Sequence, residues 1–156
     1  MIRAYTPADR DACLAIFDSN VPKFLAPRER PMFEEWSLAP RGQFFVVCDD
    51  SGAVAGCGGV AVKSGTTIAT FTWGMIHATR HGQGLGRELT LHRLRLIARM
   101  SSVNSAALDT SQETVGFYEK LGFKRVGWIP NHYGPGLDRH DLSADVDDAF
   151  RRRFGG

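Results

Sequence analysis

Three strand-like stretches follow one another closely in the first half of the chain. Residues 43–62 predict two strands joined at Asp50-Ser51-Gly52, which is a hairpin turn signal. Residues 66–76 predict a third strand, whose period of two places Phe71, Trp73 and Met75 on one face. Because only short turns separate the three stretches, they predict an antiparallel meander.

The second half of the chain alternates between helical and strand-like patterns. A broad apolar face over residues 85–100 predicts a helix packed on a sheet. Leu85, Leu89, Leu96 and Met100 form one side of this face, and Leu91 and Leu94 form another. A buried strand over 103–110, a capped helix over 111–122 ended by Gly122, and a strand over 123–129 follow. A last strand over 136–144 and a short terminal helix or tail over 145–154 complete the prediction.

The first forty residues predict helices rather than a further sheet. After a short strand over 2–6, Thr6 is a helix cap, Pro7 fits the first helical position, and Asp9 lies in the first turn of a helix through about Asn20. The prolines between 21 and 42 allow only a short helix around residues 28–36. The flanking loops are free to form a lid or a pocket wall.

Composition narrows the class of protein. The 156 residues, 43% of them hydrophobic, fit one domain over 1–156, and no repeat or linker divides it. Nineteen basic residues nearly balance 17 acidic ones, so we expect no nucleic acid partner. No stretch approaches the length of a membrane span and the N-terminus has no apolar leader, so we expect a cytoplasmic protein without a membrane partner. Three cysteines without paired spacing indicate neither disulfides nor a metal site.

The most specific chemistry lies in "RHGQGLGR", residues 80–87, at the start of the predicted helix. A glycine-rich turn before a helix presents unpaired N–H groups and the positive end of the helix dipole, which attract phosphate. The alternative is an ordinary turn whose glycines only supply positive φ. Neither the P-loop nor the dinucleotide fingerprint fits, because the first lacks its lysine and Arg87 and Leu89 stand where the second needs glycine.

Two separated motifs resemble the GNAT superfamily of N-acetyltransferases. "RHGQGLGREL" resembles the glycine loop of that family, and "VGFYEKLGFKRVG" is similar to its tyrosine-containing helix and following strand. The likeness covers roughly residues 43–128. It implies an α/β (α+β) fold with a central mixed, mostly antiparallel sheet, flanked by helices on both faces. In that fold the sheet splays after the strand that ends at Ile76, and the splay admits the cofactor.

The resemblance also implies a set of site residues. It assigns the pyrophosphate of acetyl-CoA to the loop formed by Gly82, Gln83, Gly84, Leu85, Gly86 and Arg87. It assigns the pantetheine arm to the strand end formed by Gly74, Met75 and Ile76, and Ser111 stands at a further position that contacts the cofactor. Tyr118 matches the tyrosine that protonates the departing thiolate. A phenol with a pKa near 10 is chemically suited to that role. The alternative for Tyr118 is plain packing in an amphipathic helix.

The chain departs from the family pattern at several positions. His81 stands where the family usually has Arg or Gln, Thr114 replaces a frequent alanine, and Ser111 stands where an asparagine often binds the cofactor. Ser111 also fits a helix cap. The optional glutamate base of the central strand is missing. His77, Glu34, Glu35 and Asp109 are alternatives, each with an ordinary turn, cap or surface role, and a water chain to bulk is another.

The sequence therefore predicts transfer of an acetyl group from acetyl-CoA to the primary amine of a small molecule or peptide, by direct attack and without a metal. Arg28, Arg30 and Arg139 are candidates for binding a substrate carboxylate. Another acyl donor, an oxygen acceptor, and a non-catalytic acyl-CoA-binding or sensing module remain alternatives. A homodimer is also left open.

Overall fold

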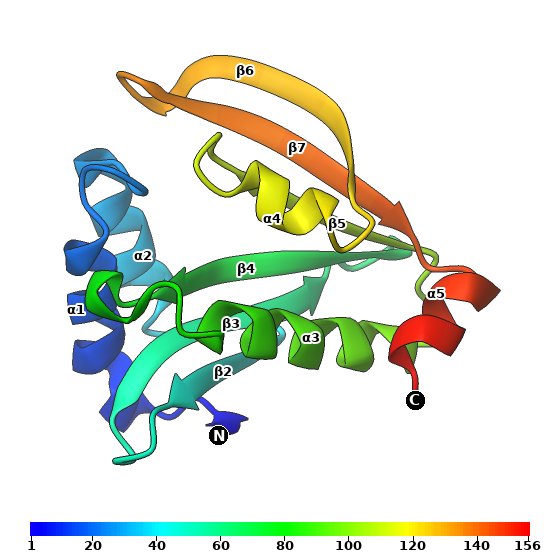
Figure 1. Cartoon of the computed structure of the whole chain (residues 1–156), viewed down its shortest axis with the longest axis horizontal. Coiled ribbons are helices and arrows are strands. Elements are labelled where there is room, and N and C mark those ends of the chain that lie inside the picture. The colour runs from blue at the N-terminus through cyan, green and yellow to red at the C-terminus, as the bar shows by residue number, and fades with distance from the viewer.

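A computed structural model describes all 156 residues and shows a seven-stranded sheet with helices on both faces (Figure 1). The strands are β1 (Ile2–Ala4), β2 (Gln43–Cys48), β3 (Val54–Val62), β4 (Ile68–Ile76), β5 (Ser105–Thr110), β6 (Lys124–Gly134) and β7 (Leu137–Asp145). The helices are α1 (Arg10–Ser19), α2 (Arg30–Trp36), α3 (Leu85–Ala98), α4 (Val115–Glu119) and α5 (Asp148–Phe154). No helix combines the length and the apolar character that crossing a membrane requires.

The strand order is β1-β2-β3-β4-β5-β7-β6, and every neighbouring pair is antiparallel except β4 and β5. The predicted meander is therefore confirmed as β2, β3 and β4. The turn between β2 and β3 contains Gly52 with φ of 86°, a conformation that glycine adopts without steric cost. The predicted mixed, mostly antiparallel sheet is also confirmed.

The prediction that Phe71, Trp73 and Met75 share one face of β4 is wrong. Cys57 pairs with Met75 while Gly59 pairs with Thr72, so the single residue Gly58 on β3 faces two residues of β4. This irregularity is a β-bulge, and Trp73 within it has φ of 40°. The extra residue reverses the alternation, because Phe71 then packs on one face of the sheet while Trp73 and Met75 pack on the other.

Two hydrophobic clusters stabilise the sheet, one on each face. The first packs α3, α5 and the loop around Val103 against β4, β5 and β7. The second packs α1 and α2 against β2, β3 and β4. Figure 1 shows α3 and α5 along one side of the sheet, and α1 with α2 on the other. The sheet is therefore covered on both faces, as predicted.

The buried face of α3 differs from the predicted one. Of the four residues expected along its main apolar side, Leu89 alone is buried. The buried positions are Leu89, Thr90, Arg93, Leu94, Ile97 and Ala98. These positions follow the helical spacing of three and four residues, but two of them are polar, so the side of the helix that packs on the sheet could not be recognised from hydrophobicity alone.

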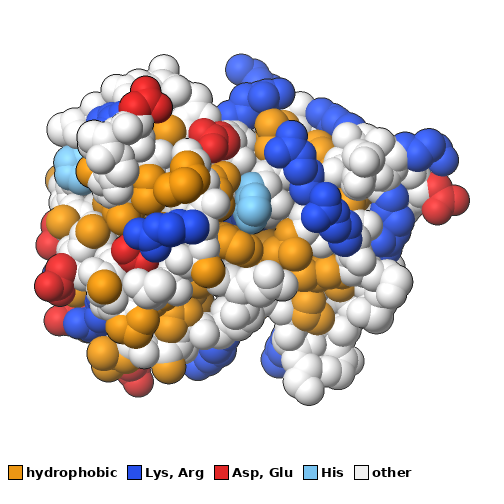
Figure 2. Space-filling view, turned by 90° about the horizontal axis from the view of Figure 1, so that it is seen from below, with side chains coloured by type: hydrophobic (Ala, Val, Ile, Leu, Met, Phe, Trp, Pro, Cys, Tyr) orange, Lys and Arg blue, Asp and Glu red, His pale blue; other side chains and the backbone are white.

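The C-terminal segment forms α5 and closes one end of the first cluster. Asp147 caps the helix by accepting the Phe150 N–H at 2.9 Å, and Phe150 and Phe154 are buried. The Arg151 guanidinium donates to the carbonyls of Ala98, Met100 and Val103 at 2.8, 3.2 and 2.7 Å, which ties α5 to the end of α3. Figure 2 shows Lys and Arg side chains gathered on the right, the side on which α5 lies in Figure 1.

The sheet opens between β4 and β5. Their parallel pairing covers only Ile68–Thr70 with Ser105–Ala107. From Phe71 to Ile76, β4 has no partner strand on this side, while β5 continues its pairing with β7 as far as Thr110. The splay was expected after β4, and it begins within this strand. The edge of β4 from Phe71 to Ile76 that faces β5 therefore has no partner strand.

The Arg3–Asp9 ion pair links β1 to the start of α1 and generates a stability prediction. Both terminal nitrogens of the Arg3 guanidinium donate to Asp9 at 2.8 Å, and the Thr6 N–H donates to it at 2.9 Å. The bond from Arg3 is the main cause that lowers the pKa of Asp9 to about 2. Asp9→Asn should reduce the free energy of unfolding near neutral pH by about 1 kcal/mol, a value discounted for the partly exposed Arg3.

The pH dependence of this effect has a defined sign. Because the folded pKa of Asp9 is depressed, the contribution is complete above about pH 4 and is lost as the pH falls toward 2. Urea unfolding of the wild type and Asp9→Asn should therefore converge in acid. Asp11→Asn, at an exposed position of α1, is the matched control and should change little. A constant difference between wild type and Asp9→Asn down to pH 3 would contradict the assignment.

Candidate functional site

A cleft of about 960 Å³ lies where β4 and β5 separate. One end is formed by the loop before α3, the middle by β4, α3 and α4, and the other end by the residues before α2 and by the ends of β5, β6 and β7. Figure 1 shows β4 and β7 diverging toward the side on which α1 and α2 lie. Nine of the predicted site residues line it: Gly74, Met75, Ile76, Gly82, Gly84, Gly86, Arg87, Ser111 and Tyr118.

The loop at the first end offers a row of free N–H groups. The first backbone bond within the helix runs from the Glu88 N–H to the Gly84 carbonyl, and no N–H from Gly82 to Arg87 donates to a protein acceptor. Gly82 and Gly84 have φ of 75° and 84°, and a Cβ added at either would meet no atom within 4 Å. The loop therefore leaves open space in front of the N-terminus of a 14-residue helix, which suits an anion.

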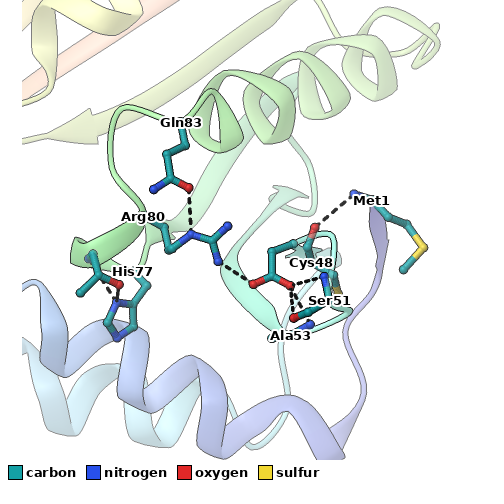
Figure 3. Close-up of polar contacts among 9 residues, drawn as sticks. Met1, Cys48, Ser51, Ala53, His77, Arg80 and Gln83 are labelled. Atoms are coloured by element: carbon teal, nitrogen blue, oxygen red, sulfur yellow. Dashed lines mark hydrogen bonds and ion pairs between the residues drawn. The ribbon is translucent and has the colours of Figure 1, made fainter.

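Polar side chains hold this loop in place (Figure 3), and one of them, Arg80, also lines the cleft. The Arg80 guanidinium forms an ion pair with Asp49 at 2.5 Å and donates from Nε to the Gln83 side chain at 2.9 Å. The Ser51 hydroxyl and then Arg80 lower the pKa of Asp49, so the carboxylate stays charged. The Gln83 side chain is therefore engaged within the loop, and Gln83 and Leu85 do not line the cleft.

Two side chains bind the end of β4. The Ile76 carbonyl lies 2.9 Å from Asn20 Nδ2 and 2.9 Å from His81 Nε2, and since a carbonyl only accepts, Nε2 carries the proton. The His81 ring also packs edge-on against Phe24 at 4.9 Å. His81 therefore anchors the strand that precedes the loop, and its imidazole is not free to bind phosphate through Nε2.

Tyr118 lies in the middle of the cleft. Its half-buried ring contacts Phe71, Phe117 and Phe123 at centroid distances of 6.2, 5.0 and 6.1 Å. The ring is packed as the core interpretation requires, while the same residue also lines the cleft. Both interpretations of Tyr118 therefore agree with its position. Its hydroxyl donates no hydrogen bond to a protein acceptor.

The helix that carries Tyr118 is shorter than predicted. It begins at Val115 rather than near Ser111, because residues 112–114 form turns. The Ser111 hydroxyl accepts the Glu113 N–H at 3.4 Å, a local bond of the capping kind, and the same buried residue lines the cleft. Gly122, with φ of 103°, follows the helix as the predicted terminating glycine.

The second end of the cleft is rich in ionisable groups. The Tyr133 hydroxyl donates to Asp109, and burial and this bond raise the pKa of Tyr133. Burial also raises the pKa of Glu29, with a contribution from Asp109. Arg139 lines the same end and donates to Asp141 at 2.8 Å. Sequence analysis identified Asp109 and Arg139 but missed Glu29 and Tyr133, which no motif marks.

The other candidate acid–base and carboxylate-binding residues separate into two groups. Asp109 and Arg28 line the cleft. Glu34 and Glu35 are exposed on α2, Arg30 pairs with Asp18 at 2.8 Å, and none of the three lines the cleft. His77 Nδ1 lies 3.2 Å from the Thr79 N–H, so His77 caps a turn outside the cleft. The structure thus favours the turn and surface roles for His77, Glu34 and Glu35, and an ion-pair role for Arg30.

Comparisons with known proteins agree with this architecture. Residues 40–125, more than half of the chain, match the family model described as an acetyltransferase (GNAT) domain. No match was found among curated protein sequences. Among solved structures, the ribosomal-protein-S18-alanine N-acetyltransferase from Escherichia coli aligns with a TM-score of 0.78 at 20% identity, over 94% of each chain.

Two further solved structures show the same fold. An aminoglycoside 6'-N-acetyltransferase complexed with coenzyme A aligns with a TM-score of 0.73 at 17% identity, over 94% of this chain and 97% of the other. A GNAT protein from Kribbella flavida aligns with a TM-score of 0.75 at 21% identity, over 93% and 96% of the two chains. The family match supports an acyltransferase. The chain belongs to the GNAT acetyltransferase family.

Gly74 generates a prediction about the middle of the cleft. A Cβ added at Gly74 would lie 3.0 Å from both terminal nitrogens of the Arg93 guanidinium, which stacks on Phe71 at 4.0 Å. Gly74→Ala should therefore displace the guanidinium and lower the free energy of unfolding by about 1–2 kcal/mol. Gly86→Ala is the control, because its Cβ meets only Ile76, at 3.5 Å. Equal urea midpoints for both variants would contradict this packing.

Proposed function

We propose that this protein transfers the acetyl group of acetyl-CoA to a primary amine of a small molecule or peptide. One observation carries the proposal: the free N–H groups of Gly82 to Arg87 face open space beside a strand edge that has no partner. A pyrophosphate satisfies such N–H groups, and an amide-containing chain can add to such an edge as a further strand. Coenzyme A contains both, in one molecule.

The residues present fit that cofactor in order along the cleft. Gly82, Gly84, Gly86 and Arg87 would hold the pyrophosphate, and Gly74 and Met75 would bind the amides of the pantetheine arm. The thioester supplies an activated acetyl group. Tyr118 lies beyond this edge in the middle of the cleft. Family membership supports acetyl-CoA as the donor.

The chemistry requires a proton donor at the leaving sulfur. The amine nitrogen attacks the thioester carbonyl carbon, the carbon–sulfur bond breaks, and its electron pair goes to sulfur. The Tyr118 hydroxyl then gives its proton to the thiolate, and the proton lost by the amine leaves through a base or water. None of the three cysteines lines the cleft, in keeping with direct attack rather than an acyl-enzyme.

An amine acceptor fits the second end of the cleft. Glu29 and Asp109 supply negative charge that attracts an ammonium group, and the raised pKa of Glu29 brings this carboxylate closer to the range of a general base. The solved neighbours carry names that include aminoglycoside, ribosomal-protein alanine and spermidine acetylation. Those acceptors are all amines, which supports an amine here.

The glycine loop is tested by Gly84→Val. A valine side chain would fill the open space in front of the free N–H groups. Because several hydrogen bonds to a charged group would then be lost, acetyl-CoA affinity should fall at least about 100-fold while the fold stays intact. Isothermal titration measures the affinity. Gly65→Val is the matched control, because Gly65 also has positive φ and open surroundings but lies in the turn before β4. Unchanged affinity in folded Gly84→Val would overturn the assignment.

Tyr118→Phe separates catalysis from packing. The variant keeps the ring among its aromatic neighbours and removes only the proton donor, so kcat should fall roughly 100-fold while acetyl-CoA affinity and stability change little. Steady-state kinetics with a panel of amines gives kcat. Tyr5→Phe, at a ring outside the cleft, is the control. Equal kcat in wild type and Tyr118→Phe would remove Tyr118 from the mechanism, and tight binding without any turnover would favour a sensing module.

A further inference from the structure

Arg93 is a buried cation on the sheet-facing side of α3. Only 2% of the residue is exposed, and Leu89, Leu94 and Ile97 on the same side of the helix are equally buried. Arginine keeps its charge in proteins, and removing that charge from water costs several kcal/mol unless it is compensated. A buried arginine therefore normally has a carboxylate partner.

No carboxylate compensates Arg93. It takes part in no ion pair, its Nε has no hydrogen-bond partner, and its single hydrogen bond runs from Nη2 to the Thr90 hydroxyl at 3.4 Å. The ionisable groups that face it are the Tyr118 phenol and the Cys57 thiol. Burial lowers the pKa of Arg93, and the Tyr118 hydroxyl acts in the opposite direction. The guanidinium thus adjoins neutral groups only.

The surroundings nevertheless hold the guanidinium firmly. Its central carbon lies 4.0 Å from the centre of the Phe71 ring, a cation–π contact. Gly58 and Gly74 leave the room it occupies, since a Cβ at either would come within 3.2 Å of its nitrogens. These two glycines belong to neighbouring strands at the β4 bulge. The fold therefore reserves a fitted space for this cation.

The position of this space connects Arg93 to the reaction. Arg93, Gly74 and Tyr118 line the same part of the cleft. In the proposed reaction this is where the carbon–sulfur bond breaks and negative charge develops on sulfur. A fixed cation in a water-poor site stabilises such charge without reorganisation. The missing negative partner of Arg93 is then supplied by the reaction itself.

We propose that the buried guanidinium of Arg93 orients the Tyr118 hydroxyl and stabilises the negative charge on the departing coenzyme A sulfur. The inference rests on the proposed function. Arg93 gives and takes no proton: the electron pair of the broken bond goes to sulfur, and the proton comes from Tyr118. Arg93 acts by charge, so its effect should appear in kcat and not in the KM for acetyl-CoA.

The sulfur itself provides a direct readout. An opposite charge within about 4–6 Å lowers the pKa of an acidic group by roughly 1–3 units. The thiol of bound coenzyme A should therefore ionise at lower pH than the thiol of free coenzyme A. The ultraviolet absorbance of the thiolate measures this ionisation. Arg93→Met should raise this apparent pKa by at least about one unit and lower kcat roughly 10-fold or more, and Arg93→Lys should restore part of both.

Arg95→Met is the matched control, because Arg95 lies on the exposed side of the same helix. It should leave both the thiol titration and kcat unchanged. A titration of bound coenzyme A that is the same in Arg93→Met and wild type would overturn the proposal. Where Arg93→Met does not fold, the wild type alone decides, since a bound thiol that titrates exactly like free coenzyme A excludes a nearby functional cation.

Calorimetry with coenzyme A distinguishes the two levels of inference. Binding and turnover by the wild type, with no effect of Arg93 on the thiol or on kcat, would remove the role of Arg93 and leave the proposed function intact. An absence of coenzyme A binding by the folded wild type would overturn both.

Discussion

The unpaired edge of β4 is the constraint on which the site depends. Backbone N–H and C=O groups inside a protein require partners, and a strand edge within a sheet normally finds them on its neighbour. Here the pairing of β4 with β5 ends at Thr70 and Ala107. The bulge opposite Gly58 bends and twists β4 a few residues further on. The cleft follows from this geometry. Its walls include α3, which connects the two strands that separate, and α4, which follows β5.

The helix α3 brings three parts of the structure together. Its N-terminus leaves free N–H groups at the cleft, its buried side places Arg93 beneath the β4 bulge, and its C-terminal end is bonded by Arg151 of α5. The terminal segment, whose role the sequence left open, therefore helps to fix the helix that carries these free N–H groups. The ion pair between Arg80 and Asp49 similarly fixes the loop before α3 to the β2–β3 turn. The helix α3 is thus held at both of its ends.

Much of the fold could be predicted because local signals agreed with it. Alternation located β2, β3 and β4, and the glycines located the start of α3. The cap signal at Thr6 located the 3-10 turn Pro7–Asp9, which leads into α1 at Arg10. Two of the failures have one physical cause. The bulge at Trp73 and the burial of Arg93 depend on contacts between Gly58, Gly74 and α3, which are far apart in the sequence. A pattern that counts arginine as exposed selects the wrong side of the helix, and period two fails wherever an extra residue enters a strand.

The two ends of the cleft differ in how the sequence encodes them. The first end and the strand edge beside it are lined by residues from two short stretches, 74–76 and 82–87, so short motifs suffice to specify them. The second end includes Glu29, Asp109, Tyr133 and Arg139, which come from four separate segments. No local pattern records such a combination, and each member can change without disturbing the loop. This separation explains how proteins with names as different as those of the solved neighbours keep one fold at about 20% identity.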